Sequence, residues 1–269
     1  MRRISAKPAA ESGRRTDTEM FVDAFSRGLQ VIRTFDRDRE RQTLSEVAAR
    51  AGISRASARR LLHTLVHLNY VQHDGRYFSL KPKILDLGYA YISSMEFNDL
   101  AVDSMHELAS RTNSSCSIAV LEGLDAVYVA RTTVRRVIGR LFPVGRRLPA
   151  YVLSMGRIQL AALSDDALDR YLAAADIERF TRYTVVDRKA LRRIIREDGA
   201  KGWSVVKREF DEGMCALAMP LRNKDGDVIA ALGLGLRPDR ADEPAFVEES
   251  LAEVAKTAEA INGLMRQRG

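Results

Sequence analysis

Residues 54–70 read SRASARRLLHTLVHLNY, a segment that is cationic at its front and rich in leucine behind. Three arginines fall within its first seven positions, and leucines then recur at helical spacing. On a helical wheel, Leu61, Leu62 and Leu65 lie within about 60° of Ala58, while most of the polar side chains point elsewhere. We therefore predict a helix that packs its leucines against a neighbouring element and exposes its basic front.

The residues just before this segment predict a second helix and a tight turn. Thr43 is a candidate N-cap for the sequence LSEVAARA, and Glu46, three residues later, completes a capping box. Gly52 suits the left-handed conformation of a tight turn, and Ser54 is placed to cap the basic helix. A helix, a short glycine turn and a basic second helix indicate a helix-turn-helix, whose second helix enters the major groove of DNA.

The flanking segments extend this module on both sides. Residues 21–35, FVDAFSRGLQVIRTF, repeat apolar side chains at helical spacing and predict a first helix with one apolar face. After the basic helix, YVQHDGRYFSL alternates around Asp74 and Gly75, which is a strong hairpin signal. The hairpin would be the wing of a winged helix-turn-helix, with Arg76 beside its tip placed to reach a phosphate or the minor groove.

The net charge of +7 lies entirely in the first third of the chain. The first 95 residues hold 17 of the 43 Lys and Arg residues but 10 of the 36 Asp and Glu residues, so the two signs balance in the remainder. A basic module joined to a neutral one predicts that the basic module binds a polyanion. A winged helix that contacts only other proteins is the alternative interpretation.

The residue types of the basic module suit duplex DNA. Arginine donates two hydrogen bonds to guanine, small side chains let a helix approach the groove, and amides at a helix start hold phosphates. The residues predicted to contact DNA are Thr43, Ser45, Ser54, Arg55, Ala56, Ser57, Arg59, Arg60, Thr64 and Arg76.

Residues 82–268 predict an α+β arrangement. A helix restarts after Pro82 and is predicted to link two domains. Strands are expected as a hairpin at 115–132 and again at 202–210, 214–221 and 227–236, with helices at 99–111, 155–163, 165–175, 187–199 and 243–267. Strand runs with segregated helices favour an antiparallel sheet with helices packed on it.

No catalytic constellation emerges from the sequence. It has no Gly-rich phosphate loop, nucleophile elbow or paired histidine ligands, so neither a cofactor nor a metal site is predicted. Cys215 and His106 leave open an enzyme with a thiol nucleophile and its base, although a cysteine within MCALAM is more typical of a packed core. The polar N-terminus and the lack of a long apolar run predict a cytoplasmic protein without membrane segments.

The stretch PVGRRLPAYVLSMGRIQLAAL, residues 143–163, predicts a site for an acid. Its Gly- and Pro-shaped loop leads into a helix that Ser154 is predicted to cap, and exposed amides at a helix start favour an anion. The adjacent arginines 146 and 147 are expected on a solvated face, and attraction of the acid by Arg146 or Arg147 is the alternative. An ordinary N-cap without a ligand is the alternative.

Several of these segments resemble one family of bacterial transcription factors. MFVDAFSRGLQVIRTF, TLSEVAARAGISRASARRLLHTLVHLNYV and the wing resemble the winged helix-turn-helix domain of the isocitrate-lyase-regulator (IclR) family. VGRRLPAYVLSMGRIQLA and GWSVVKREFDEGMCALAMPLRN resemble its effector domain, although Val206 and Arg222 depart from the usual residues. SRASARRLL, FSRGLQVI and LPAY…SMGR are most similar to the branch that controls protocatechuate, 4-hydroxybenzoate and β-ketoadipate metabolism.

The resemblance implies a ligand-responsive regulator that binds double-stranded operator DNA and is not an enzyme. It implies a GAF-like effector domain, an aromatic or dicarboxylic organic acid as effector, and a homodimer or a dimer of dimers. The effector pocket it assigns consists of Ala150, Tyr151, Ser154, Met155, Gly156, Glu209, Cys215, Ala216 and Leu217. The domains it implies are a disordered tail at 1–19, a DNA-binding domain at 20–81, a linker helix at 82–97 and an effector-binding domain at 98–268.

Overall fold

The computed structural model describes residues 21–36, 38–94, 98–132 and 142–268. Contacts divide the chain into two compact units, Met1–Tyr91 and Ile92–Gly269. The tail predicted at 1–19 lies outside the described residues. Within the described ranges, no helix combines the length and the apolar character needed to cross a membrane.

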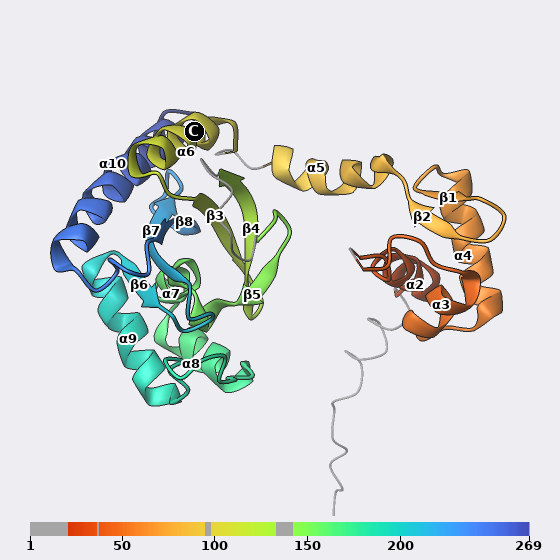
Figure 1. The fold of residues 1–269 in the computed structure, drawn as a ribbon, viewed down its shortest axis with the longest axis horizontal. Coiled ribbons are helices and arrows are strands. Elements are labelled where there is room, and N and C mark those ends of the chain that lie inside the picture. Colours follow the sequence, from red (N-terminus) through yellow and green to blue (C-terminus); the bar gives the residue numbers. More distant parts are fainter. Residues whose placement is uncertain (1–20, 37, 95–97, 133–141, 269) are drawn as a thin grey trace, which may run out of the picture. The chain divides into compact units, whose positions relative to one another are not determined.

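The first unit is a three-helix module with a two-stranded wing (Figure 1). Its elements are α2 (Asp23–Ile32), α3 (Leu44–Arg50), α4 (Arg55–His67), β1 (Val71–His73) and β2 (Phe78–Leu80). Leu62 and Leu65 of α4 share one core with Val47 of α3 and Phe78 of β2. The helix-turn-helix and the hairpin wing predicted from the sequence are therefore confirmed.

The apolar face predicted for the first helix is packed only at its end, where Ile32 and Phe35 lie against the core, and its front is exposed. The side chains of Phe21, Phe25 and Leu29 are 63%, 69% and 43% exposed. Gly28 faces α4 instead, where an added methyl carbon would lie 3.9 Å from Leu61 Cδ2. The helix approaches α4 along its glycine side, so its aromatic side stays on the surface.

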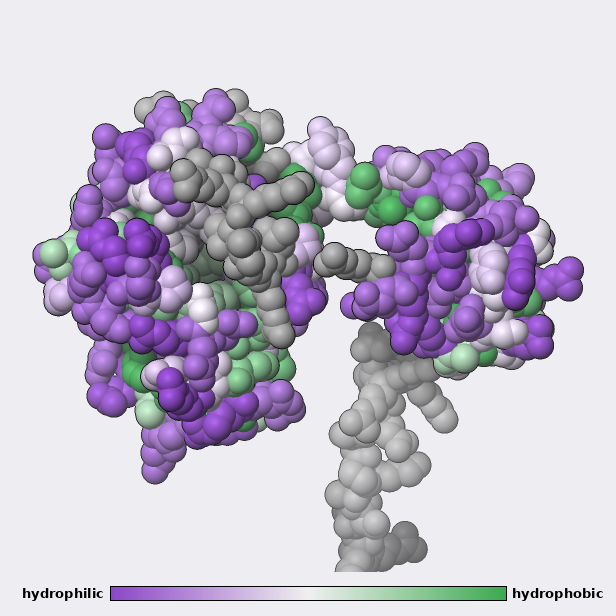
Figure 2. Space-filling model, viewed as in Figure 1, coloured by the Kyte–Doolittle hydropathy of each residue, from purple (hydrophilic) through white to green (hydrophobic). Residues whose placement is uncertain are grey.

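The linker predicted at 82–97 consists of a 3-10 turn, η1 (Pro82–Ile84), followed by α5 (Leu85–Ser93). Residues 95–97 lie outside the described residues. Large apolar side chains of α5 are more than half exposed, and Figure 2 shows hydrophobic residues on the surface along this helix. These side chains belong to Leu85, Leu87, Tyr89 and Tyr91.

The second unit is a six-stranded antiparallel sheet with helices on both faces (Figure 1). The strand order is β5-β4-β3-β8-β7-β6. The strands are β3 (Cys116–Glu122), β4 (Asp125–Thr132), β5 (Arg147–Pro149), β6 (Ser204–Lys207), β7 (Cys215–Arg222) and β8 (Val228–Leu236). One face packs against α6 (Asn98–Thr112) and α10 (Pro244–Arg268), the other against η2 (Ala150–Val152), α7 (Ser154–Leu160), α8 (Asp165–Ala174) and α9 (Arg188–Lys201). The predicted α+β class is confirmed.

Strand β5 and the turn η2 are absent from the sequence prediction. β5 is three residues long and pairs with β4, Arg147 opposite Val127 and Pro149 opposite Asp125. Its proline and the loop residues before it carry no strand signal of their own, so the strand depends on its partner. Together β5 and η2 lead the chain to the start of α7.

Candidate functional site

The front of α4 carries three exposed arginines, Arg55, Arg59 and Arg60. Within the part of the chain that the structure describes, their guanidinium groups make no hydrogen bond or ion pair with another residue. Arg50 of the same unit differs, because it pairs with Asp36 at 2.8 Å. The positive charge of α4 is therefore available to a partner outside the chain.

The orientation of α4 is fixed by its cap and its buried face. Ser54 Oγ accepts the N–H of Ser57 at 3.1 Å and lies 3.0 Å from Ser57 Oγ, so the predicted cap is confirmed. Ala58 and Leu62 are fully buried, whereas Ala56 is exposed on the opposite side. A small residue on the exposed side allows the helix backbone to approach another surface closely.

Two threonines predicted to contact DNA use their hydroxyl groups within the protein. Thr43 Oγ1 donates to Glu46 Oε2 at 2.8 Å and accepts the Glu46 N–H at 3.4 Å, which confirms the capping box. The N–H and hydroxyl of Thr43 lower the pKa of Glu46, and the resulting carboxylate repels a phosphate at this point. Thr64 Oγ1 donates to the Arg60 carbonyl at 3.0 Å. Ser45 is exposed on α3.

The tip of the wing is held by Asp74. Its Oδ1 accepts the N–H groups of Tyr77 at 2.8 Å and Arg76 at 3.0 Å, and these hydrogen bonds lower the pKa of Asp74 to about 2. Asp74 also pairs with Arg41. The guanidinium groups of Arg41 and Arg76 each lie 5.0 Å from the Tyr77 ring centroid. Gly75 adopts φ of 98°, so the turn requires a glycine.

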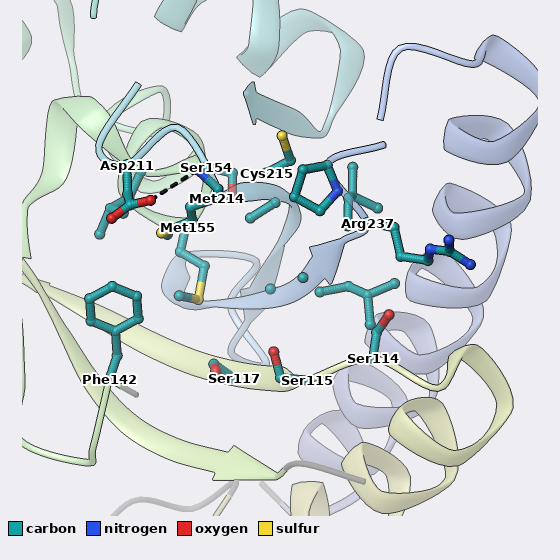
Figure 3. Close-up of a pocket in the computed structure, with 18 of the residues that line it drawn as sticks. Ser114, Ser115, Ser117, Phe142, Ser154, Met155, Asp211, Met214, Cys215 and Arg237 are labelled. Atoms are coloured by element: carbon teal, nitrogen blue, oxygen red, sulfur yellow. Dashed lines mark hydrogen bonds between the residues drawn. The ribbon is translucent and has the colours of Figure 1, made fainter. Parts of the chain in front are cut away.

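The second unit contains a cavity of about 560 Å³ between the sheet and the start of α7 (Figure 3). Its floor is made by small residues on three neighbouring strands and the turn before β3. These residues are Ser115, Ser117, Ala216, Gly233 and Gly235. Larger side chains at these positions would fill the space.

Strand β8 keeps the cavity floor open because glycine and leucine alternate along it. Gly233 lies opposite Ser117 in the sheet, and a Cβ added there would lie 2.8 Å from Met155 Sδ. A Cβ added at Gly235 would lie 3.0 Å from Ser115 Oγ. The alternate residues of β8 are leucines that belong to the core on the α6 and α10 face, namely Leu232, Leu234 and Leu236. Successive side chains of a strand point to opposite faces, so the glycines of β8 border the cavity and its leucines pack in the core on the other face.

Aromatic and sulfur-containing side chains form the walls of the cavity. The rings of Tyr128 and Phe142 stack with centroids 5.8 Å apart. Met155 and Met214 also line the space. Burial raises the pKa of Tyr128 to about 12, so its phenol stays protonated and can donate a hydrogen bond.

Polar groups concentrate at the sheet side of the cavity. Ser114, Ser115 and Ser117 point into it in Figure 3. Arg131 lies opposite Ser117 in the β3–β4 register, which puts both side chains on the same face. Arg131 Nη1 donates to the Phe142 carbonyl at 3.1 Å. Hydroxyl donors and a guanidinium therefore share one end of the cavity.

Four of the nine residues predicted for the effector pocket line this cavity, namely Ser154, Met155, Cys215 and Ala216. The other five lie outside its lining. Leu217 belongs to the core on the opposite face of the sheet. Gly156 packs against Ala150, where an added Cβ would lie 2.1 Å from the carbonyl oxygen. The Tyr151 hydroxyl accepts the Glu178 N–H at 2.9 Å.

Glu209 forms a buried ion pair rather than lining the cavity. Its Oε2 lies 2.7 Å from Nη2 of Arg157, and these two side chains are 9% and 2% exposed. The same oxygen accepts the N–H of Val185 at 3.0 Å, and Arg157 Nε donates to the Tyr151 carbonyl at 2.7 Å. The ion pair joins α7 to the segment between β6 and β7. Other residues of α7 and of this segment line the cavity. Sequence reasoning missed it because the partners are 52 residues apart.

The helix start at Ser154 also differs from the prediction. The helix α7 begins at Ser154 itself, its N-cap is Leu153, and no side chain caps it. Ser154 is 2% exposed, because the seven residues of α7 are all buried. Ser154 therefore contributes to the cavity wall and not as an N-cap.

The other residues considered from the sequence form neither a catalytic pair nor a binding group for an acid or a metal among the described residues. Burial raises the pKa of the Cys215 thiol, and His106 is exposed on α6, so the geometry gives no support to a thiol nucleophile with a histidine base. Arg147 pairs with Glu122 at 2.7 Å, and neither it nor Arg146 lines the cavity. Among the described residues, no three side chains form a group that could hold a metal ion.

Comparison with known proteins relates both units to one family. The model of the IclR helix-turn-helix domain matches residues 24–75, and that of the bacterial transcriptional regulator IclR C-terminal domain matches residues 89–263. The chain is 39% identical to the Pca regulon regulatory protein of Pseudomonas putida, over 88% of this chain and 82% of that protein. It is 29% identical to the p-hydroxybenzoate hydroxylase transcriptional activator of Acinetobacter baylyi, over 92% of this chain and 93% of that protein.

A solved structure shares the fold. The IclR homologue of Microbacterium hydrocarbonoxydans, complexed with 4-hydroxybenzoate, superposes with a TM-score of 0.82 at 24% identity, over 91% of this chain and 100% of that one. The two family models together span most of the present sequence. The chain therefore belongs to the IclR family of bacterial DNA-binding transcriptional regulators.

Proposed function

We propose that this regulator acts in the cytoplasm on genes of aromatic-acid catabolism and responds to a small organic acid bound in the cavity. We assign operator binding to residues 20–81, the linker helix to 82–97 and effector binding to 98–268. The observation that carries the proposal is the cavity of about 560 Å³ with serine hydroxyls and Arg131 at one end. The functions of two relatives support it, since one activates a p-hydroxybenzoate hydroxylase gene and another regulates the Pca regulon.

The shape and lining of the cavity suit an organic acid of one ring or of similar size. Ligand sites of about 300–1,000 Å³ are typical for small molecules, and they combine apolar walls with a few placed polar groups. Here Tyr128, Phe142 and Met155 supply the apolar walls. A carboxylate at the Ser117 and Arg131 end would receive hydroxyl and guanidinium hydrogen bonds, which are the stronger kind when the acceptor is charged.

Ligand binding and DNA binding would be coupled through conformation. An acid that binds one arrangement of the second unit better than another shifts the population of that arrangement. Coupling is reciprocal, so operator DNA must change the affinity for the acid by the same factor. The acid is bound and not consumed, in keeping with the raised pKa of the Cys215 thiol.

Melting temperature tests the effector site directly. An aromatic acid such as protocatechuate or 4-hydroxybenzoate, at 100 times its Kd, should add about 2.7 kcal/mol to the free energy of unfolding, because it binds the folded state alone. The Gly235→Val variant fills the cavity floor beside Ser115, so it should lose this stabilisation. Gly263→Val on α10 is the matched control, since an added carbon there meets Arg266 at 4.0 Å and no part of the cavity. Full stabilisation of Gly235→Val by the same acid would place the site elsewhere.

The two exposed apolar helix faces of the first unit would join two copies of the chain. Phe25 on α2 and Leu85 and Tyr89 on α5 are each about 70% exposed. Monomeric proteins rarely leave large apolar patches in water, and a two-fold axis brings the same patch of two copies together. Two α4 helices would then read half-sites about 10 bp apart, or a multiple of that spacing, in a roughly palindromic operator.

Introducing negative charge on these two helix faces is expected to separate the two copies of the chain. Phe25→Glu combined with Tyr89→Glu should convert the dimer to a monomer at micromolar concentration, as measured by sedimentation velocity, because two buried unpaired carboxylates oppose association. Val144→Glu, at an apolar residue of the second unit that is 46% exposed, is the control and should leave the mass unchanged. A dimer that survives the double substitution would show that another surface joins the copies.

A further inference from the structure

The cavity contains one acidic side chain whose role the proposed function leaves unassigned. Among the described residues of the lining, Asp211 is the only carboxylate. It lies in the segment between β6 and β7, and its Oδ1 accepts the N–H of Gly213 at 2.9 Å. In Figure 3, Asp211 lies on the side of the cavity opposite Ser114, Ser115 and Ser117. A site built for an acid thus contains a fixed negative charge at its far end.

The positive charges of the lining are not placed to neutralise Asp211. Arg237 pairs with Asp239 at 2.6 Å, and its guanidinium points away from the cavity in Figure 3. Arg131 lies beside Ser117 on the sheet face and donates to the Phe142 carbonyl. No hydrogen bond or ion pair joins Arg131 or Arg237 to Asp211 within the described residues. The two ends of the cavity therefore differ in polarity, with hydrogen-bond donors at the sheet and a carboxylate acceptor at the opposite end.

This polarity decides how an acid can lie in the cavity. A carboxylate near Asp211 would be repelled, because like charges in a half-buried site raise the energy of both. A ligand carboxylate must therefore lie at the Ser117 and Arg131 end. The group that reaches Asp211 must then donate a hydrogen bond, since an ionised carboxylate is an acceptor only.

Resting on the proposed function, we infer that Asp211 selects the effector by accepting a hydrogen bond from its hydroxyl group. The effector class is then a monocarboxylic acid with a hydroxyl donor at the far end of its ring, and dicarboxylic acids are rejected. A hydrogen bond to a charged group contributes about 1.5–3 kcal/mol, so the selection corresponds to about 10- to 100-fold in affinity.

Three probe acids that differ at one position test the inference by isothermal titration calorimetry on the full chain. 4-Hydroxybenzoate carries the hydroxyl donor, benzoate carries hydrogen, and terephthalate carries a second carboxylate. The unmodified protein is expected to bind 4-hydroxybenzoate about 10- to 100-fold more tightly than benzoate, and to bind terephthalate most weakly. In Asp211→Asn, which keeps an acceptor for the Gly213 N–H, the preference for the hydroxyl should fall about tenfold and terephthalate should bind more tightly than before.

The controls separate the role of Asp211 from the existence of the site. Glu212→Gln changes the neighbouring carboxylate, which is exposed and 3.7 Å from Arg182, and should leave all three affinities unchanged. If the acids bind but Asp211→Asn keeps the same affinity ratios, the selecting role is refuted while the acid site stands. If none of the three binds the unmodified protein, both the selecting role and the aromatic-acid site are refuted.

Discussion

Replacing Arg55, Arg59 and Arg60 by alanine together should weaken operator binding on the order of a thousandfold. Each well-placed arginine contact contributes about 1–3 kcal/mol, and these three guanidinium groups have no partner within the described residues. The slope of log K against log salt concentration should also flatten by about 2 to 3, because fewer counterions are released. A titration of the DNA upstream of the protein's own gene, at several salt concentrations, measures both.

The matched control removes the same charge from the second unit. The triple variant Arg170→Ala, Arg182→Ala and Arg193→Ala changes exposed arginines, and two of these make surface ion pairs with Glu212 and Glu197. Surface pairs contribute about 0–1 kcal/mol, so this variant should stay folded and bind the operator nearly as before. Tight, sequence-specific binding by the folded α4 variant would refute the assignment of this helix as the DNA reader.

Breaking the buried pair of Arg157 and Glu209 is expected to cost the second unit about 3–5 kcal/mol of stability. Arg157→Met keeps the volume of the side chain but leaves the Glu209 carboxylate buried with the Val185 N–H as a neutral partner. At about 2–4 °C per kcal/mol, the melting temperature should fall by roughly 10 °C. The acid should also bind more weakly, because the pair joins α7 to the 208–214 segment at the cavity.

A double-mutant cycle distinguishes this pair from ordinary packing. Adding Glu209→Gln to Arg157→Met removes the uncompensated charge, so the double variant should be more stable than the sum of the single changes predicts. The exposed pair of Arg193 and Glu197 on α9, 3.3 Å apart, is the control and should change stability by about 0.5 kcal/mol or less. If the losses of stability caused by the substitutions at positions 157 and 209 simply add, the charge pairing contributes nothing.

The helix-turn-helix was predictable because its signals are local. The capping box of Thr43 and Glu46, the cap at Ser54 and the spacing of the α4 leucines each act within one or two helical turns. The docking side of α2 was only partly predictable from its apolar stripe, since Phe25 and Leu29 face outward and the close approach to α4 is made along Gly28. An amphipathic pattern indicates a face that will be buried, and it does not say whether the partner is the same chain.

The lining of the cavity proposed as the effector site was predictable only in part, for a related reason. Met155 and Ala216 were expected in the pocket and line it, whereas Glu209 was expected there and instead neutralises Arg157. Ion pairs between distant segments depend on the fold and leave no local pattern. The small residues of the floor did leave a signal, because glycine alternates with leucine in residues 232–236, but the alternation has meaning only once the two faces of the sheet are known.

The glycine and leucine alternation of β8 also bears on how such a regulator changes over evolutionary time. Positions 233 and 235 border the space open to small molecules, while the leucines between them anchor the helical layer behind. Under the proposed function, substitutions at the two glycine positions would change the shape of the acid-binding space while the core leucines of the same strand stay in place. One or two substitutions on a single strand of the second unit would then give a regulator that responds to a different small molecule and keeps its helix-turn-helix unchanged.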